Sequence, residues 1–253
     1  MKTIDEAKYA DLVVQWLQEK VGGAKAKGVV LGLSGGLDSA VMAVLAKRAF
    51  PMDTLGLIMP CHSQGEDAEH ALELARQFQI KTKTVDLTPV YDLLAHTLEE
   101  AAETKGTQLD VALGNIKSRL RMNTLYYFAA AYNYLVVGAT NKSELMTGYF
   151  TKHGDSGVDL LPIAQLVKAE VRQLAEYLQV PSMIIQKPPS AGFWPGQTDE
   201  DEMGVTYEEL DSYLRDGDGS QDTVRTIIDL QTRTEHKRAF PMMPEFPLPY
   251  IKS

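Results

Sequence analysis

The spacing of hydrophobic and polar residues in the first third of the chain predicts short strands that alternate with helices. Residues 28–33 and 54–59 are apolar runs of the length that buried strands have, and residues 81–86 follow as a third strand. Apolar residues at helical spacing predict helices over residues 4–21, 39–48 and 66–79. This alternation is typical of a doubly wound α/β fold, a parallel sheet with helices on both faces.

The same pattern continues to residue 178. Helical spacing recurs over residues 89–104, 111–133 and 167–178, and residues 134–138 form a fourth apolar run. The helix at 111–133 is rich in aromatic residues and is predicted to belong to the core or to an interface. Two stretches, residues 146–159 and 188–204, predict irregular loops, and long loops of this kind often serve as lids. We expect a single domain over residues 1–253.

Composition narrows the kind of protein. With 253 residues and 44% hydrophobic residues, the chain can bury a full core. The net charge of −9 argues against an extended nucleic-acid surface, which needs a face rich in lysine and arginine. We expect no membrane contact, because no apolar run approaches the roughly 18 residues of a membrane span. Cys61 is the only cysteine, which excludes an intramolecular disulfide and suits the cytoplasm.

One motif lies between the first predicted strand and the helix that follows it. Residues 34–39 read Ser-Gly-Gly-Leu-Asp-Ser. Glycines permit a tight turn, and successive backbone N–H groups at a helix N-terminus bind phosphate. The motif has neither the Gly-Lys-Ser/Thr of a Walker A loop nor the spacing of a dinucleotide-binding fingerprint. Its simpler interpretation is a glycine turn in which Ser39 caps the helix.

This motif resembles the SGGxDS signature of the ATP pyrophosphatase superfamily. The resemblance implies a Rossmann-like fold of the adenine nucleotide alpha hydrolase type, in which the loop holds the β- and γ-phosphates of ATP as a pyrophosphate leaving group. It also implies that Ser34, Gly35, Gly36 and Ser39 contact the pyrophosphate. Asp38 would bind Mg²⁺, an ion that prefers hard oxygen ligands.

Later segments resemble one family within that superfamily. They are residues 139–144, 147–162, 187–192, 196–202 and 234–238. Their number and order, over roughly residues 5–240, make the chain similar to the ammonia-dependent NAD synthetases. Residues 139–144 follow the fourth predicted strand, and strand carboxyl ends line the ligand crevice of open α/β sheets.

The family resemblance implies roles for individual residues. Glu144 would be a second Mg²⁺ ligand beside Asp38, and Lys168 would complete the catalytic group. Thr140, Lys168 and Ser190 would contact the ATP phosphates or the leaving group. The residues implied for contact with deamido-NAD are Asn115, Arg119, Arg121, Lys152, Asp155, Asp159, His236 and Lys237.

The resemblance also implies the reaction and its partners. The carboxylate of deamido-NAD would attack ATP to give an adenylate and pyrophosphate, and ammonia would then release AMP and form the amide. ATP is the co-substrate, Mg²⁺ the cofactor, and a homodimer the expected assembly. The residues before position 28 leave room for one helix and not for a glutamine-hydrolysing domain, so we expect ammonia from solution or from a partner. The two irregular loops, at 146–159 and 188–204, are the candidates for a lid that excludes water from the adenylate, with Gly192, Gly196 and Gly204 as its hinges.

Several of these residues have simpler interpretations. Lys168 opens a predicted helix, where a cation opposes the helix dipole, so it has either an anionic partner or a solvated position. Arg119 and Arg121 lie on different faces of their helix, so at least one of them is expected on the surface, and Arg121 is the better candidate for the site. His236, isolated among charges, is equally compatible with a solvated position.

Other features are predicted to carry no chemistry. The acidic run at residues 199–202 is interpreted as a solvated loop without a catalytic role. His62 beside Cys61 lacks a second pair of ligands, which excludes a metal site there. Two alternative functions remain open: a tRNA-modifying or other adenylating amidotransferase, and a non-catalytic nucleotide sensor that would tolerate loss of Asp38 and Glu144.

Overall fold

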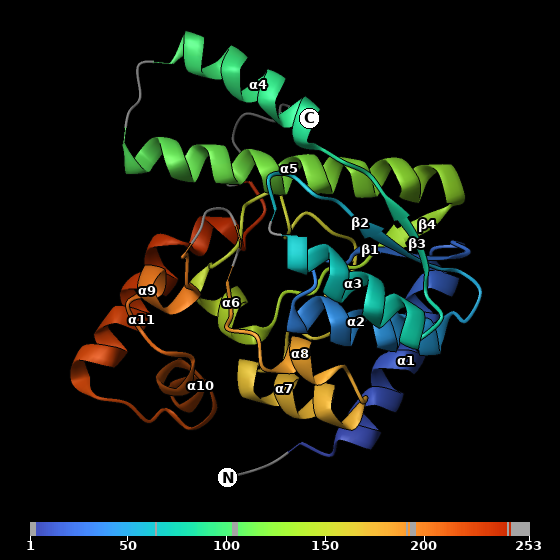
Figure 1. The fold of residues 1–253 in the computed structure, drawn as a ribbon. Coiled ribbons are helices and arrows are strands. Elements are labelled where there is room, and N and C mark those ends of the chain that lie inside the picture. Colours follow the sequence, from blue (N-terminus) through green and yellow to red (C-terminus); the bar gives the residue numbers. More distant parts are fainter. Residues whose placement is uncertain are drawn as a thin grey trace, which may run out of the picture.

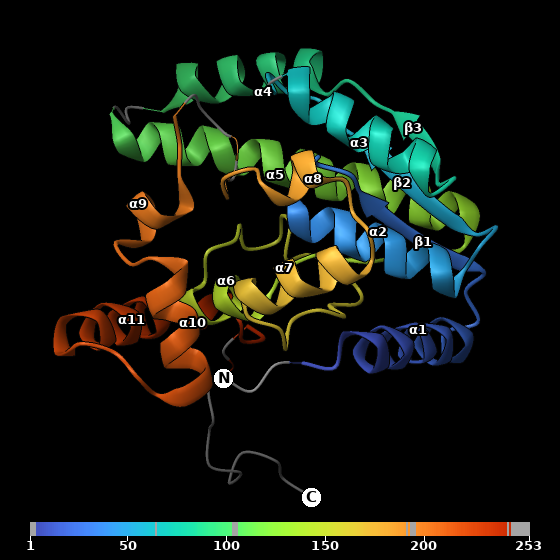
Figure 2. The ribbon, with the colours of Figure 1, turned by 60° about the horizontal axis from the view of Figure 1, so that its bottom comes forward.

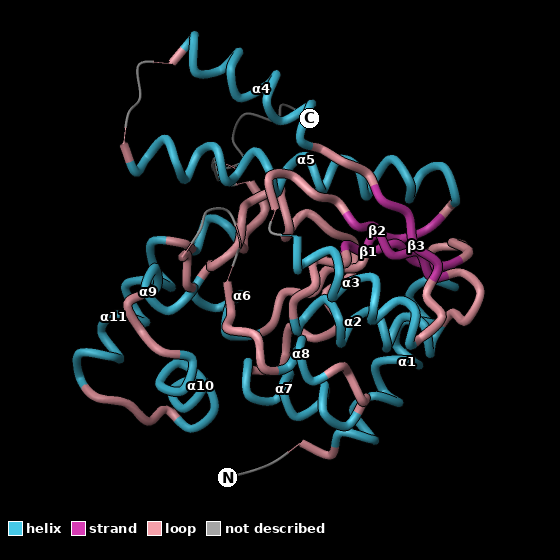
Figure 3. Tube along the Cα trace, viewed as in Figure 1, coloured by secondary structure: helices cyan, strands magenta, loops and turns pink. Residues whose placement is uncertain are grey.

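The structure, a computed structural model, describes residues 4–63, 65–102, 106–190, 192, 196–241 and 243. Its centre is a parallel sheet with the strand order β3-β2-β1-β4, and all three strand pairings are parallel. The strands are β1 (Gly28–Gly32), β2 (Thr54–Ile58), β3 (Lys81–Thr84) and β4 (Tyr134–Val136). Figure 3 shows them gathered in one part of a mainly helical molecule. The predicted parallel sheet is confirmed.

Helices cover both faces of the sheet because successive side chains of a strand point to opposite faces. In β1, Val29 and Leu31 pack on one side and Val30 on the other, and all three are buried. The first face carries α1 (Glu6–Gly23), α2 (Leu37–Ala49), α3 (Gly65–Gln77), α7 (Lys168–Tyr177) and α8 (Ser182–Ile185). The second carries α4 (Thr88–Ala101) and α5 (Thr107–Tyr132). The fold is therefore doubly wound (Figure 1).

A third group of helices forms its own small core. It consists of α9 (Asp199–Met203), α10 (Tyr207–Asp216), α11 (Gln221–Arg233) and the short helix η1 (Glu235–Lys237), which lie beside α6 (Lys142–Thr147). Met203, Leu210 and Ile227 are among its buried side chains. Figures 1 and 2 show this group on the opposite side of the molecule from β3. The group packs on the rest of the fold through contacts of α10 with α6 and α7.

The sequence interpretation missed these last helices. It assigned no helix after residue 178, and it treated residues 199–202 as a solvated loop, which is wrong because they open α9. Thr198 caps α9, and acidic residues in a first helical turn are favoured by the helix dipole. Thr206 and Glu209 form a capping box at the start of α10, a signal that the sequence does contain. The fourth strand is also shorter than predicted, ending at Val136.

The side chains of helix α5 divide between the core and the surface. Leu125 and Ala129 are buried against the second face of the sheet. Tyr127 is 70% exposed, and Val111 and Tyr132 are also exposed. One face of the helix is thus core, and the other is open. Among the helices that the structure describes, none combines the length and apolar character needed to cross a membrane.

The buried position of Leu45 in α2 gives a test of the first core. Leu45 is fully buried, so Leu45→Ala removes apolar contacts and leaves a cavity, and we expect a loss of about 2–5 kcal/mol in the free energy of unfolding. Leu12→Ala on α1, where the side chain is 53% exposed, is the matched control and should change it by less than about 0.5 kcal/mol. Urea unfolding followed by circular dichroism measures both. Equal losses for the two variants would contradict this assignment of the core.

Candidate active site

A cavity of about 900 Å³ opens where the parallel strands end. Leu33 and Ser34 follow β1, Met59 follows β2, and Ala139 and Thr140 follow β4, and all of them line the cavity. The carboxyl ends of adjacent parallel strands are where open α/β sheets bind ligands. The opposite wall comes from the third group of helices, which contributes Asp199, among other residues. The volume suits a small molecule of nucleotide size.

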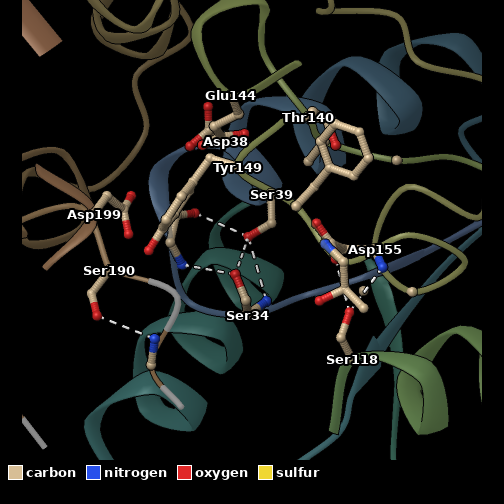
Figure 4. Close-up of a pocket in the computed structure, with 18 of the residues that line it drawn as sticks. Ser34, Asp38, Ser39, Ser118, Thr140, Glu144, Tyr149, Asp155, Ser190 and Asp199 are labelled. Carbon is tan, nitrogen blue, oxygen red and sulfur yellow. Dashed lines mark hydrogen bonds between the residues drawn. The ribbon is translucent and has the colours of Figure 1, made fainter. Parts of the chain in front are cut away.

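The loop after β1 forms a compact turn in the wall of this cavity. The hydroxyl oxygens of Ser34 and Ser39 are 2.9 Å apart, and the Gly36 N–H donates to Ser34 Oγ over 3.3 Å (Figure 4). Gly35 has a φ of +76°, and a Cβ there would lie 2.3 Å from the carbonyl oxygen of Asp67, so only glycine fits. Gly36, and not Ser39, is the N-cap of α2, which removes the simpler interpretation of Ser39. The turn presents backbone N–H groups and two hydroxyls at a helix N-terminus, a typical phosphate site.

A buried lysine joins two carboxylates beside that turn. Lys168 Nζ lies 2.5 Å from Asp38 Oδ2 and 3.3 Å from Glu144 Oε1. The lysine side chain is only 8% exposed, which excludes the solvated surface position. Asn141 donates from Nδ2 to Asp38 Oδ1 over 2.8 Å, and it also caps α6, on which Glu144 lies. Three segments far apart in sequence therefore meet at one charged cluster.

Burial sets the proton affinities in this cluster. Desolvation raises the pKa of Glu144 to about 8; the charge of Asp38 adds to this rise, and Lys168 opposes it. Desolvation alone would lower the pKa of Lys168, but the charges of Asp38 and Glu144 together outweigh it, so its pKa lies above the ordinary value. Lys168 therefore stays an ammonium ion at neutral pH, and its closer contact is with Asp38.

The acidic side chains of the cavity decide whether it can hold Mg²⁺. Asp38 and Glu144 offer two hard carboxylate groups on the same cavity wall. Over residues 4–63, 65–102, 106–190, 192, 196–241 and 243, no group of three or more histidine, cysteine or carboxylate side chains is arranged to hold a metal. Two carboxylates still fit Mg²⁺, which keeps several waters and takes further ligands from phosphates. His62 pairs with Asp92 at 2.6 Å, and the absence of a metal there stays a prediction.

Asp199 lines the cavity, although the sequence interpretation gave it no role. It is 4% exposed, and Tyr207 donates its hydroxyl to Asp199 Oδ2 over 2.9 Å. The other oxygen, Oδ1, finds no hydrogen-bond partner among the described residues. Burial raises the pKa of Asp199, and the charge of Lys168 lowers it. The interpretation of this position as solvated is therefore corrected, because α9 turns its first residue inward.

Most of the residues predicted for the nucleotide and dinucleotide lie around the same space. Those that line the cavity are Ser34, Gly36, Asp38, Ser39, Asn115, Arg121, Thr140, Glu144, Asp155, Lys168, Ser190, His236 and Lys237. Figure 4 shows residues of the strand-end loops, α2, α5 and α6 facing it together. Predicted residues as far apart in the sequence as Ser34 and Lys237 therefore lie around one cavity.

Asp155 and Arg121 are two charged residues of the cavity lining that hydrogen bonds hold in place. Asp155 Oδ1 accepts from Ser118 Oγ at 2.8 Å and from the Thr151 N–H at 2.9 Å. Asp155 is open to the cavity yet surrounded by protein atoms, and this desolvation raises its pKa. Arg121 donates to the Met59 carbonyl and to Ser63 Oγ, both at 3.2 Å, and burial lowers its pKa.

Four predicted residues are not part of the cavity lining that the described residues form. Gly35 packs so closely against the Asp67 backbone that a Cβ would clash there. Lys152 donates to the His236 carbonyl at 2.6 Å, and Arg119, on the exposed face of α5, donates to the Lys152 carbonyl at 3.3 Å. Asp159 accepts the Val136 N–H at 2.7 Å and the hydroxyl of Tyr126 at 3.0 Å.

The predicted lid at 188–204 falls partly outside the described residues. The structure describes residues 188–190, 192 and 196–204 of it. Gly192, Gly196 and Gly204 all have positive φ angles, a conformation that favours glycine. Ser190 accepts the Gly192 N–H at 3.1 Å. The lid itself stays a prediction.

The raised pKa of Glu144 predicts how stability changes with pH. An acid whose folded pKa lies above its unfolded value of 4.5 destabilises the fold progressively as pH rises from about 4.5 to 8. In Glu144→Gln this titration is absent, so the stability of the variant relative to the original chain should increase between pH 5 and pH 8, by an amount on the order of 1 kcal/mol or more. Urea unfolding in EDTA at several pH values measures the difference. A difference that is constant with pH would contradict the shift.

The chain is similar in sequence and in structure to known proteins. The family model of NAD synthase matches residues 9–241. The NH(3)-dependent NAD(+) synthetase of Carboxydothermus hydrogenoformans is 51% identical over 92% of this chain and 95% of that protein. The structure of NMN synthetase from Francisella tularensis has a TM-score of 0.91 and 40% identity, covering 96% of this chain and 100% of the other. The NH3-dependent NAD synthetase of Campylobacter jejuni has a TM-score of 0.78 and 32% identity, with coverage of 96% and 100%.

These neighbours confirm the adenine nucleotide alpha hydrolase type of Rossmann-like fold. The family match spans most of the chain and contains the turn at 34–39, the lysine cluster and Asp155. The chain belongs to the NAD synthase family.

Proposed function

We propose that this protein is an ATP-dependent ligase that converts the nicotinate carboxylate of deamido-NAD to the amide with ammonia, the last step of NAD biosynthesis. The observation that carries the proposal is the union, in one cavity, of a phosphate-binding turn and the cluster of Lys168, Asp38 and Glu144. The names of its relatives, NH(3)-dependent NAD(+) synthetases at 43–51% identity, support the same substrate and reaction.

The first chemical step forms an adenylate. A carboxylate oxygen of the substrate attacks the α-phosphorus of ATP, and the bond from that phosphorus to the β-phosphate bridging oxygen breaks. Pyrophosphate leaves with the electron pair. Ser34, Gly35, Gly36 and Ser39 would hold the leaving group through backbone N–H groups and hydroxyls, with Thr140 and Ser190 beside them. Donors fixed before the reaction stabilise developing charge without reorganisation.

The second step exchanges oxygen for nitrogen at the activated carbonyl. Ammonia adds to the carbonyl carbon, the bond to the phosphate oxygen breaks, AMP leaves, and one proton is released. Neither step requires a covalent enzyme intermediate. The protein therefore acts chiefly by positioning the reactants and by neutralising phosphate charge, for which the buried ammonium of Lys168 is suited.

We further propose that Asp38 and Glu144 hold Mg²⁺, which when bound would supply positive charge to the phosphates of ATP. Lys168 now lies between these carboxylates. It would keep the two acidic groups balanced in charge until a cation and ATP arrive, and then contribute its own charge to the phosphates.

The deamido-NAD end of the site is assigned to a second part of the cavity. Asn115, Arg121, Asp155, His236 and Lys237 line it. The remaining members of the proposed set are Arg119, Lys152 and Asp159, which hydrogen-bond within the protein and are not part of the cavity lining that the described residues form. They would act by supporting the wall or by meeting a part of the dinucleotide that extends beyond the cavity.

We also propose the domain organisation, the assembly and the cellular location of the enzyme. A single domain over residues 1–253 is supported by the contacts of α10 with α6 and α7. A homodimer is proposed because α4 and α5 expose large apolar side chains, including Leu93 at 71% and Tyr127 at 70%. A cytoplasmic location is proposed because ATP is consumed and the one cysteine, Cys61, is free and buried.

A second candidate substrate is the mononucleotide acid that corresponds to NMN. The observation that favours it is the TM-score of 0.91 with a protein described as NMN synthetase. Both reactions share the adenylation chemistry and differ in the length of the substrate. Comparing kcat/KM for the two acids under identical conditions distinguishes them, and a higher value for the mononucleotide would replace deamido-NAD in the proposal.

The reaction predicts its products directly. Incubation with ATP, Mg²⁺, ammonium and deamido-NAD should give AMP, pyrophosphate and NAD in equal amounts, measured by chromatography. ADP in place of AMP would exclude cleavage between the α- and β-phosphates. Nucleotide binding without turnover would indicate a sensor, and turnover only with another carboxylic or carbonyl substrate, including tRNA, would indicate a different adenylating enzyme.

Asp38 provides the test of the charged cluster. Asp38→Ala should lower NAD formation by about 100-fold or more, because it removes a metal ligand and the closest partner of Lys168. The variant should keep a folded circular dichroism spectrum without denaturant but have a lower free energy of unfolding, because Lys168 loses its closest partner. Asp222→Ala, at an exposed position in the first turn of α11, is the control and should keep full activity. Near-normal turnover of Asp38→Ala would remove this residue from the site.

A further inference from the structure

Asp211 is a buried carboxylate on α10 for which the mechanism has so far given no use. It is 2% exposed, and it is not among the residues that line the cavity. Its Oδ1 accepts the hydroxyl of Ser143 at 2.6 Å, and its Oδ2 accepts the backbone N–H of Ala169 at 2.7 Å. Each oxygen therefore bonds to a different helix, Ser143 being on α6 and Ala169 on α7.

The start of α7 explains why such a partner is needed. The first residue of the helix is Lys168, a cation where the helix dipole is positive, and the residue before it is Val167, which has no side-chain acceptor. The Lys168 N–H instead donates to Ser143 Oγ over 3.2 Å, and the next N–H donates to Asp211. A negative charge from a helix 42 residues away in sequence thus caps α7 and offsets the unfavourable position of the lysine.

The same carboxylate also fixes α6. Ser143 is fully buried, and it precedes Glu144, whose carboxylate faces Lys168. Lys142 strengthens the link, because its ammonium group donates a hydrogen bond to the Leu214 carbonyl of α10 over 3.0 Å. Asp211 consequently ties together the helix that carries Glu144 and the helix that carries Lys168. Burial raises the pKa of Asp211, and the hydrogen bonds from Ser143 and from the backbone of Ala169 and Lys168 oppose that rise.

We propose that Asp211 is a positioning residue of the active site, which acts through Ser143 and the first turn of α7 to set the place of Lys168 relative to Asp38 and Glu144. This inference rests on the proposed function only in its use of ATP. Asp211 does not touch the reactants. Replacement of Asp211 changes the direction from which the Lys168 ammonium reaches the phosphates. The hydrogen bonds of Asp155, in another part of the cavity lining, do not involve Asp211 and stay in place.

The test is a double-mutant cycle on nucleotide binding. Titration calorimetry measures the affinity for α,β-methylene-ATP with Mg²⁺ in the original chain, Asp211→Asn, Lys168→Met and the double variant. We expect Asp211→Asn to weaken binding about tenfold when Lys168 is present and less than about twofold when it is absent, because coupled residues are not additive. Affinity for deamido-NAD should change less than twofold. An equal loss in both backgrounds, or no loss, would overturn the proposal.

Two further variants separate positioning from general stability. Glu209→Gln, on the same helix, exchanges a carboxylate for an amide in the exposed capping box of α10 and should leave nucleotide affinity unchanged. Ser143→Ala removes the relay while Asp211 stays, and it should reproduce the dependence on Lys168. If Asp211→Asn unfolds, Ser143→Ala decides the question in its place. If the original chain itself fails to bind the ATP analogue, the proposed function fails, and not this inference alone.

Discussion

A buried ammonium ion held between two carboxylates is the interaction on which the site depends. Lys168 lies 2.5 Å from Asp38 and 3.3 Å from Glu144, with all three side chains largely withdrawn from water. Removing one partner of such a group leaves an uncompensated buried charge, which costs far more than a surface ion pair. The arrangement therefore fixes α2, α6 and α7 relative to one another. The phosphate-binding turn, at the start of α2, is placed as a consequence.

The N-terminal ends of three helices form the polar part of this site. The turn at 34–39 leads into α2, Asn141 caps α6 beside Glu144, and Lys168 opens α7. Each start presents N–H groups without a partner in its own helix, so each attracts oxygen atoms of other segments. Asn141 shows how these contacts combine, because one amide caps α6 and binds Asp38 at once. The polar interior of the cavity follows from the geometry of the ends of three helices.

The sequence predicted what depends on local pattern and on motif. The apolar runs gave β1 and β2 within a residue or so, and the motifs gave Asp38, Glu144 and Lys168, which the fold brings together. It did not reveal Asp199 or Asp211. An acidic residue in a polar stretch looks the same whether it faces solvent or a distant helix, and the partners of Asp211 lie 42 and 68 positions away. A capping box, Thr206 with Glu209, marks the start of α10 in the sequence, so this helix was predictable from local pattern although it was not predicted.

The wall of the cavity formed by the C-terminal helices has a small apolar core of its own, around Leu210 and Ile227. Its links to α6 and α7 include the hydrogen bonds of Asp211 and Lys142, and the Lys168 ammonium lies 5.2 Å from the centre of the Tyr207 ring. Asp211 and Ser143 are buried, so parting this wall from α6 and α7 would leave interior polar groups without partners, which costs more than the loss of a hydrogen bond at the surface. A change in the position of this wall around a guest molecule therefore carries Glu144 and Lys168 with it.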